Sequence, residues 1–336
     1  MNILRNSKLN SINHSYCIFF LLLFSFFAMY PVWKIDGWPT NHDGMLLFDR
    51  VGAFYYEFQK GNFFPLWTSY GQNGYGSAFP FLYHRFFNTV GALLAFPLGS
   101  IYLGVKFSIL LFLFIGGAGM YKLISKIGLN FQYALCAAIL FIFANYTFTN
   151  WLIRGAVAEL TAMIFIPWLF YYCIQLLLNR NTGFQIGLVL SCMFYSHIVI
   201  CYYAFFTVIV FYFIYLLDSK KYLKLINYFP IFLTLLVILL LCSLYALGII
   251  YYKKIYNFSV LVQEFSNPVN NFPLFERFLI NRRYVWGKSG DNMTVEIGRV
   301  FNLLSIFITA STIFLLLFKK ISFKSIENKR NIYISQ

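Results

Sequence analysis

The sequence predicts an all-α fold: a polytopic transmembrane helix bundle of about eight spans, with interfacial helices in the first loop outside the membrane. Of its residues, 60% are hydrophobic and 11% are charged, and the mean hydropathy is +0.69. A soluble core of this length could not bury so much apolar surface, so lipid must solvate part of it. Apolar runs of membrane-spanning length recur along the chain, and basic residues gather near their ends.

These apolar runs supply the candidate spans, because a helix needs about 20 apolar residues to cross a bilayer. The first run follows Arg5 and Lys8 and resembles a signal peptide. Bulky Met29, Tyr30 and Trp33 stand where a cleavage site needs small residues, so we interpret this run as an uncleaved span. The candidate spans are residues 16–33, 104–121, 131–149, 157–178, 184–197, 198–217, 225–249 and 299–318.

Two stretches do not fit a simple span. Residues 184–217 are too long for one span and too short for two full ones, and His197 lies near their middle. We therefore expect two short or tilted helices that meet there. Residues 81–100 contain His84 and Arg85, which disfavour a crossing helix and favour one that lies at the membrane interface.

Charge bias predicts the orientation of these spans. With residues 81–100 treated as non-spanning, half of the 26 Lys and Arg residues fall in five short segments on the N-terminal side of the membrane. Those segments contain two acids, Asp218 and Glu327. The positive-inside rule therefore places both termini in the cytoplasm. The five segments are residues 1–15, 122–130, 179–183, 218–224 and 319–336.

This orientation gives a single integral membrane domain, residues 1–336, with two long extracytoplasmic loops at 34–103 and 250–298. Because charge beside lipid is costly unless it is paired or used, the acids of the first loop make it the main candidate for function. The second loop is basic, and it either accepts an anionic lipid headgroup or is simply solvated. The acids of the first loop are Asp36, Asp43, Asp49 and Glu57, in a chain with 11 acids in all.

Composition excludes several classes of function. The net charge of +15 does not indicate nucleic acid as a partner, because the basic residues are scattered at the ends of apolar runs and do not line one face. Membrane lipids and topology explain them better. The six cysteines lie inside apolar runs with no CxxC motif or Cys/His cluster, which predicts neither a disulfide framework nor a metal site. We expect no cofactor.

The first candidate motif is Asn41-His42-Asp43-Gly44. Thr40 or Asn41 can cap a helix that Gly61 ends, which would put Asp43 in the first turn, where the helix dipole favours its ionised form. His42 fits a capping neighbour better than a metal ligand, since no second histidine lies at ligand spacing. Asp43 either supplies chemistry or merely supports the N-terminus of the helix.

Residues spaced by seven should share a face of this helix, which places Arg50 and Glu57 beside Asp43. Leu46, Leu47, Phe54 and Phe58 supply an apolar flank that is typical of a helix laid on the membrane surface.

Two more polar features lie later in the chain. Arg154 and Glu159 mark the outer end of two spans, where they either pair with each other or leave Arg154 to hold a phosphate. His197 lies inside an apolar stretch, as either a packed core histidine or a substrate contact. The glycine-rich segment after Trp67 carries aromatic, Asn and Gln side chains, which suit sugar rings and an interfacial aromatic belt equally.

Taken in order, several of these motifs resemble a known family. They are G-N-F-F-P-L-W at 61–67, F-P-F-L-Y at 79–83 and R-G-A-x-A-E at 154–159, after a first span and an acidic loop. The pattern resembles the bacterial polytopic proteins called "6-pyruvoyl-tetrahydropterin synthase-related domain, membrane protein", best over residues 15–200. Those proteins are similar to the GT-C glycosyltransferases. Nothing in the chain resembles the zinc-binding histidines of the soluble pterin enzyme.

The GT-C resemblance implies an activity: transfer of a sugar from a polyprenyl-phosphate or pyrophosphate carrier, outside the cytoplasm, in the bacterial inner membrane. It implies that Asp43 is the general base of an inverting reaction and that Arg154 steadies the leaving phosphate. Arg50 and Glu57 would orient groups around the acceptor. The implied partners are a lipid-linked sugar donor, membrane lipids and an acceptor that the sequence does not name. No D-x-D pair occurs, which disfavours a metal-dependent mechanism.

The alternative is a non-catalytic transporter, flippase or partner protein for polysaccharide or lipid export. A transporter should show paired broken helices and charged groups near the membrane midplane. The ionisable groups of this chain are predicted at the outer edge, with His197 the exception. This distribution favours surface chemistry over translocation.

Overall fold

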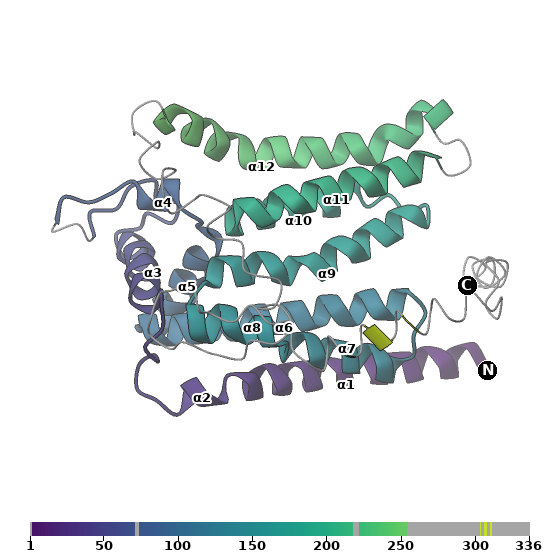
Figure 1. Ribbon diagram of the computed structural model, residues 1–336, viewed down its shortest axis with the longest axis horizontal. Coiled ribbons are helices and arrows are strands. Elements are labelled where there is room, and N and C mark those ends of the chain that lie inside the picture. Colours follow the sequence, from purple (N-terminus) through teal and green to yellow (C-terminus); the bar gives the residue numbers. More distant parts are fainter. Residues whose placement is uncertain are drawn as a thin grey trace.

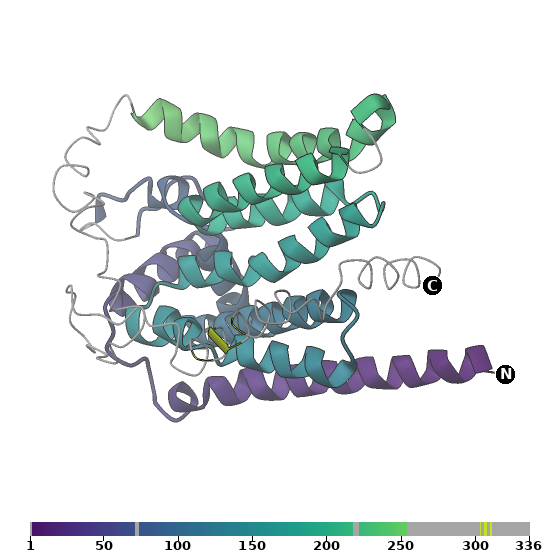
Figure 2. The same ribbon diagram turned by 45° about the vertical axis from the view of Figure 1, so that its right-hand side comes forward.

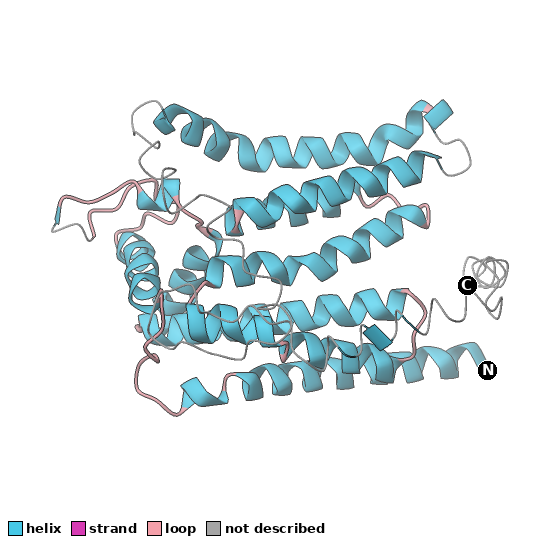
Figure 3. Cartoon of the chain, viewed as in Figure 1, coloured by secondary structure: helices cyan, strands magenta, loops and turns pink. Residues whose placement is uncertain are grey.

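A computed structural model describes residues 2–70, 74–217 and 222–253, together with positions 303, 306, 307 and 310. Side chains are described from Ser15 to Tyr252 within those ranges and at the four isolated positions. In this part of the chain the fold is all-α, as Figure 3 shows, and its nearest approach to a sheet is one isolated bridge between Thr68 and Ser77. The predicted fold class, an all-α membrane helix bundle, is confirmed.

The long helices lie side by side in Figures 1 and 2, and their connections gather at the two ends of the bundle. We call one end the loop end: there residues 34–43, 60–70, 74–85 and 155–156 connect the helices. The elements are α1 (Asn2–Ala28), α2 (Tyr30–Trp33), α3 (Gly44–Gln59), α4 (Phe79–Leu82), α5 (Phe86–Leu98), α6 (Ile101–Lys126), α7 (Phe131–Ile142), α8 (Asn145–Phe148), the π-helical turn η2 (Thr149–Arg154), α9 (Val157–Leu177), α10 (Gly183–Ser196), α11 (Ile198–Leu217), the 3-10 turn η4 (Leu225–Tyr228) and α12 (Phe229–Lys253).

Five of the described segments are long and apolar enough to cross a membrane: Ile101–Lys126, Phe131–Arg154, Val157–Leu177, Ile198–Leu217 and Leu225–Tyr252. Shorter apolar helices occur at Ser15–Ala28, Phe86–Leu98 and Gly183–Ser196. Apart from the four isolated positions, the predicted span 299–318 lies outside the described residues, as does nearly all of the predicted loop 250–298.

The expected meeting of two helices at His197 is confirmed. α10 ends at Ser196, His197 has extended backbone angles (φ −161°, ψ 108°), and α11 begins at Ile198. With its 14 residues, α10 is about 21 Å long, which is shorter than the roughly 30 Å hydrocarbon core of a bilayer. The turn at His197 therefore lies within the bundle, not beyond its end.

The candidate span at 131–149 lies within the apolar segment Phe131–Arg154, and its helix breaks after Ile142. Ala144 is extended (ψ 138°), and the chain resumes as α8 and then η2. Two hydroxyl groups donate to backbone carbonyls near the break: Thr147 Oγ1 donates to the Phe141 carbonyl at 3.1 Å, and Thr149 Oγ1 donates to the Asn145 carbonyl at 3.0 Å.

α3 is viewed nearly end-on in Figure 1, where the long helices run horizontally, so it lies across the bundle at the loop end. Its apolar flank is buried by protein, which corrects the expectation of a helix laid on lipid. Leu47, Phe54 and Phe58 are all at most 2% exposed within the core that α5 and α6 share, whereas Leu46 is exposed.

The boundaries of α3 differ slightly from the prediction. Asp43, not Thr40 or Asn41, occupies the N-cap position, and its side chain makes no capping hydrogen bond. The predicted stop is confirmed, since Gly61 adopts a left-handed conformation (φ +83°) and its N–H donates to the Phe58 carbonyl.

α5 is a short helix that packs against α6. A Cβ on Gly104 would come within 2.5 Å of the Gly91 carbonyl oxygen, so the two backbones touch where both residues are glycine. With 13 residues, α5 is about 20 Å long and too short to cross a bilayer. The prediction that 81–100 supplies no full span therefore agrees with its length.

The buried side chains form two clusters. The first joins α1, α3, α5, α6, α7 and the start of α9, and Trp151, Phe54 and Phe112 are among its largest fully buried members. The second joins the end of α9 to α10 and α11. Phe165 of α9 packs against both clusters, so α9 links the two halves of the bundle.

Candidate functional site

The first loop is attached to η2 by three hydrogen bonds. Asn41 Nδ2 donates to the Leu152 carbonyl at 3.3 Å, His42 N to the Ile153 carbonyl at 3.4 Å, and Asp43 N to the Arg154 carbonyl at 2.9 Å. The acceptors are the carbonyl groups at the end of η2, which lack intrahelical partners. Residues over a hundred positions apart thus come together at the loop end.

Gly155 permits this close approach. It is in the left-handed conformation (φ +73°), and a Cβ there would lie 2.9 Å from Asn41 Oδ1 and 3.2 Å from the Asp43 carbonyl carbon. Gly44 is restricted in the same way, because a Cβ there would lie 2.3 Å from Asn41 Oδ1. The glycine of the R-G-A-x-A-E motif therefore holds Asp43 beside Arg154.

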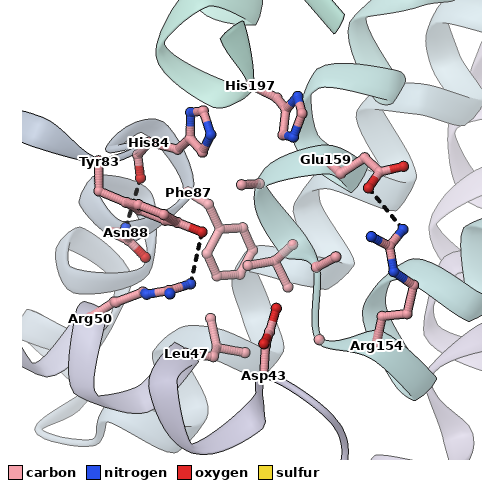
Figure 4. Close-up of a pocket in the computed structure, with 14 residues that line it drawn as sticks. Asp43, Leu47, Arg50, Tyr83, His84, Phe87, Asn88, Arg154, Glu159 and His197 are labelled. Carbon is pink, nitrogen blue, oxygen red and sulfur yellow. Dashed lines mark hydrogen bonds and ion pairs between the residues drawn. The ribbon is translucent and has the colours of Figure 1, made fainter. Parts of the chain in front are cut away.

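A cavity of about 180 Å³ lies directly behind this junction, and Figure 4 shows its lining. It has contributions from four places in the chain: α3 and its N-cap, the segment before and at the start of α5, the segment from the end of η2 to the start of α9, and the turn between α10 and α11. The lining residues are Asp43, Leu47, Arg50, Tyr83, His84, Phe87, Asn88, Arg154, Gly155, Ala156, Val157, Ala158, Glu159 and His197.

Asp43 points toward the cavity from the N-terminus of α3. Among the described residues, no hydrogen bond or ion pair engages its carboxylate. Asp43 is therefore an acceptor available to whatever enters the cavity.

Arg50 lies on the same side of the cavity, two turns along α3. Its Nη1 donates to Tyr83 Oη at 2.9 Å, and its guanidinium lies 4.1 Å from the centre of the Tyr83 ring. No carboxylate in the described part of the chain pairs with Arg50. Arg50 thus presents a cation held in place by an aromatic ring and not neutralised by an acid.

Arg154 is paired, in contrast. Its Nη1 donates to Glu159 Oε2 at 2.8 Å and to Asn150 Oδ1 at 2.8 Å, and Tyr146 Oη donates to the other oxygen of Glu159. Glu159 lies in the first turn of α9. The pairing alternative considered for Arg154 is the one that the structure contains.

Two histidines form the opposite wall from Asp43 in Figure 4. The rings of His84 and His197 stack with centroids 4.8 Å apart and planes inclined by 20°. Burial lowers the pKa of His84 to about 4, and His197 and Arg50 contribute in the same direction. The His84 imidazole is therefore neutral near pH 7.

The two histidines differ in their hydrogen bonds. His197 Nδ1 accepts from Ile200 N at 3.4 Å, whereas His84 Nδ1 is buried without a partner among the described residues. The His84 carbonyl accepts from Asn88 Nδ2 at 2.8 Å, which fixes the backbone where α5 begins. His84 thus has one ring nitrogen without a hydrogen-bond partner in the described part of the chain.

The cavity brings together most of the residues that the sequence singled out: Asp43, Arg50, Arg154, Glu159 and His197. His42 does not line it.

Glu57 also lies elsewhere. It is buried under the following loop, where Oε1 accepts from Thr68 Oγ1 at 3.3 Å, Ser69 N at 3.4 Å and Lys60 Nζ at 3.4 Å. Glu57 therefore anchors the loop and takes no part in the cavity.

The cavity also contains residues that sequence reasoning did not assign to a site, chiefly Tyr83, His84 and Asn88. A signal for them existed, because polar residues interrupt the apolar stretch 81–100. That signal was interpreted as evidence of an interfacial helix. In the described residues, no group of three or more His, Cys, Asp or Glu side chains is arranged to hold a metal ion.

Comparisons with known proteins give one match. Residues 80–289, more than half of the chain, match the family described as "6-pyruvoyl-tetrahydropterin synthase related domain; membrane protein". This range includes His84, Arg154, Glu159 and His197 of the cavity, whereas Asp43 and Arg50 precede it. Neither a curated protein nor a solved structure matches the chain.

Proposed function

The chain belongs to the family of 6-pyruvoyl-tetrahydropterin synthase related membrane proteins, and on this premise we propose that it is a membrane glycosyltransferase of the GT-C kind. It transfers a sugar from a polyprenyl-phosphate carrier to an acceptor hydroxyl. The reaction takes place at the loop end, which faces the extracytoplasmic side of a bacterial inner membrane, with both termini in the cytoplasm.

The main support for this proposal is which charged side chains of the cavity form ion pairs and which do not. Arg154 and Glu159 neutralise each other, so the groups left without a charged partner are Asp43 and Arg50. One is a carboxylate that can accept a proton, and the other is a cation that can hold a phosphate. Sugar transfer from a phosphate carrier needs a proton acceptor for the attacking hydroxyl and a cation for the leaving phosphate, with the anomeric carbon between them.

In the proposed reaction, the acceptor oxygen attacks the anomeric carbon while its proton passes to the Asp43 carboxylate. The bond between the anomeric carbon and the phosphate oxygen breaks, and the oxygen keeps the bonding electrons. Attack from the face opposite the leaving group inverts the configuration. Asp43 afterwards releases its proton to water.

Arg50 is the residue that we assign to the leaving phosphate. Its guanidinium can donate two parallel hydrogen bonds to phosphate oxygens, and Tyr83 already holds it in position. Arg154 adds a second positive charge near the same cavity, reduced by its contact with Glu159. His84 is the neutral acceptor that we assign to a sugar hydroxyl, through the Nδ1 atom that lacks a partner.

A flippase or transporter would place its charged groups deep in the bundle, along a path from one side to the other. The charged residues of the cavity instead lie on α3, which crosses the loop end, and at the start of α9. This distribution supports chemistry at one surface. A comparison of two aspartate variants separates transfer from transport.

The experiment compares Asp43→Asn with Asp49→Asn. Asp49 is a matched control, because it is an acid of the same helix that is exposed and does not line the cavity. Membranes with each variant are supplied with a radiolabelled polyprenyl-phosphate sugar and lipid-extracted acceptors, and glycan formation is measured. We expect Asp43→Asn to reduce transfer at least 100-fold, within the usual range for a lost general base, and Asp49→Asn to leave it unchanged.

Normal transfer by Asp43→Asn would refute the role of Asp43 as the base. Unchanged glycans with an altered distribution of the lipid carrier between the two leaflets would support export in place of transfer. Arg50→Gln provides an independent check, because it should slow transfer without removing the proton acceptor.

A further inference from the structure

A second, larger hollow lies on the other side of the segment that forms the cavity wall. Within residues 81–89, the polar cavity is lined by Tyr83, His84, Phe87 and Asn88. The second hollow is lined by Phe81, Arg85, Phe86 and Thr89, and no residue lines both. The second hollow has a volume of about 650 Å³, and we call it the α12 groove. Its lining is Phe64, Leu66, Phe81, Arg85, Phe86, Thr89, Tyr195, Leu240, Leu241, Leu244 and Tyr245.

The α12 groove is apolar apart from one cation. Arg85 is 5% exposed, and its Nη2 donates to the Pro65 carbonyl at 3.3 Å. Its guanidinium lies 4.0 Å from the centre of the Phe64 ring. No acid pairs with Arg85 in the described part of the chain. A buried charge without a counter-ion is costly, so a bound anion would relieve a penalty that the fold otherwise carries.

Two neighbouring features also suit an anion. Thr89 follows Arg85 by one helical turn on the same face of α5, and its Oγ1 is buried without a hydrogen-bond partner among the described residues. Arg85 itself is the N-cap of α5, a helix of 13 residues, so the positive end of the helix dipole lies beside it. Arg85 and Thr89 thus place a guanidinium and a residue with an unpartnered hydroxyl in the lining of the groove, one helical turn apart.

The rest of the groove suits a hydrocarbon chain. Leu240 and Leu244 of α12 are 68% and 78% exposed, and together with aromatic rings they leave an apolar trough along the side of the bundle. In a membrane protein, such a surface faces acyl chains and not water. The complementary ligand has an anionic head and an apolar tail.

We propose that the α12 groove binds an anionic phospholipid of the surrounding bilayer, with its phosphate at Arg85 and Thr89 and an acyl chain along Leu240 and Leu244. The polar cavity is separate from the groove, so this lipid is not the substrate of the reaction. The inference does not depend on the proposed sugar transfer.

Such a lipid would stabilise the wall of the polar cavity that contains Tyr83. Tyr245 lines the groove, and its Oη donates to the Tyr83 carbonyl at 2.9 Å. Tyr83 in turn holds Arg50 through its own hydroxyl. A lipid seated in the groove therefore restrains the backbone that positions both Tyr83 and Arg50.

The test measures phospholipid binding to the purified full chain by native mass spectrometry, with dioleoyl phosphatidylglycerol and dioleoyl phosphatidylcholine as probes. We expect phosphatidylglycerol to bind about tenfold more tightly, as one charge-assisted contact allows. Arg85→Met should abolish this preference, and Thr89→Val should weaken phosphatidylglycerol binding about threefold. Since Arg85→Met removes a buried group and can impair folding, the nearly isosteric Thr89→Val keeps the test independent of folding.

Lys106→Met is the matched control. Lys106 is a buried cation, 6% exposed, whose Nζ donates to the Ile35 carbonyl at 2.9 Å, and it does not line the groove. This variant loses the same unit of charge and should keep the preference for phosphatidylglycerol. Equal loss in Lys106→Met and Arg85→Met would overturn the proposal, because it would reveal a general effect of net charge.

Competition experiments distinguish the sources of phosphate. Inorganic phosphate at millimolar concentration should not displace phosphatidylglycerol, since it lacks the tail, and displacement would overturn the role assigned to the apolar trough. Displacement by substoichiometric polyprenyl phosphate would also overturn the assignment, because it would make the groove a carrier-lipid site.

Discussion

Replacing Gly155 by alanine tests whether the contact between the first loop and η2 builds the cavity. Gly155 has a left-handed backbone conformation. A Cβ at this position would lie close to three neighbouring atoms: Asn41 Oδ1 at 2.9 Å, the Asp43 carbonyl carbon at 3.2 Å and Gly44 N at 3.2 Å. The methyl group would displace residues 41–44, and with them the carboxylate of Asp43.

The magnitude has two parts. A left-handed conformation costs an alanine about 1–2 kcal/mol. Overpacking against backbone that cannot easily move costs about 1–3 kcal/mol more. Gly99→Ala isolates the first part, because Gly99 is also left-handed (φ +61°) but has no atom within 4 Å of its Cβ position. We therefore expect Gly155→Ala to lower the free energy of unfolding by about 1–3 kcal/mol more than Gly99→Ala does.

The assay is equilibrium unfolding of the purified chain in mixed micelles, with increasing mole fraction of a denaturing detergent. Both variants are then assayed for sugar transfer under conditions in which they are fully folded. Gly155→Ala should lose most of its transfer activity, since the hydrogen bond from Asp43 N to the Arg154 carbonyl fixes the position of the proposed base. Gly99→Ala should retain its activity.

Equal destabilisation by the two substitutions would refute the reasoning, because it would leave no contribution from the contact with Asn41 and Asp43. A folded Gly155→Ala protein with full activity would refute the link between this contact and the proposed base.

Two further predictions concern Glu57 and His84. Glu57→Gln should lower the free energy of unfolding by about 1–3 kcal/mol, because it weakens the charge-assisted bonds to Thr68, Ser69 and Lys60, and it should leave the KM for the acceptor unchanged. Loss of transfer at unchanged stability would instead place Glu57 in the site. The pKa of His84 is lowered from 6.5 to about 4 by burial and by the neighbouring His197 and Arg50, so the unfolded chain binds more protons than the folded chain between these values. The stability that the neutral His84 imidazole contributes should therefore be fully present above pH 6.5 and fall as the pH drops toward 4. His84→Gln should flatten this pH dependence of the free energy of unfolding. An unaltered pH dependence in that variant would contradict the assignment.

The sequence by itself determined the features that depend on local pattern and composition. Hydropathy identified a membrane protein, and the spacing of polar and apolar residues located the helix that ends before Gly61 and the break at His197. These features follow from short-range physics: apolar runs must be solvated by lipid, and glycine readily adopts the left-handed conformation that ends a helix.

Residue spacing failed where it was used to group side chains over two full heptads. Asp43 and Glu57 were expected on one face, but seven-residue steps drift by about 20° each along a straight α-helix. Asp43 also precedes the first helical residue, and the loop at Thr68 and Ser69 captures Glu57. The tertiary structure therefore separates two acids that the sequence pattern had paired.

Tertiary structure alone decided which charges are paired and which histidines meet. Arg154 is neutralised by Glu159 and Arg50 is not, although both are arginines near the same predicted surface. His84 and His197 stack although over a hundred residues separate them. Such contacts arise from the packing of α5 and α9 between distant helices, and packing depends on the whole set of interlocking side chains, which local sequence does not encode.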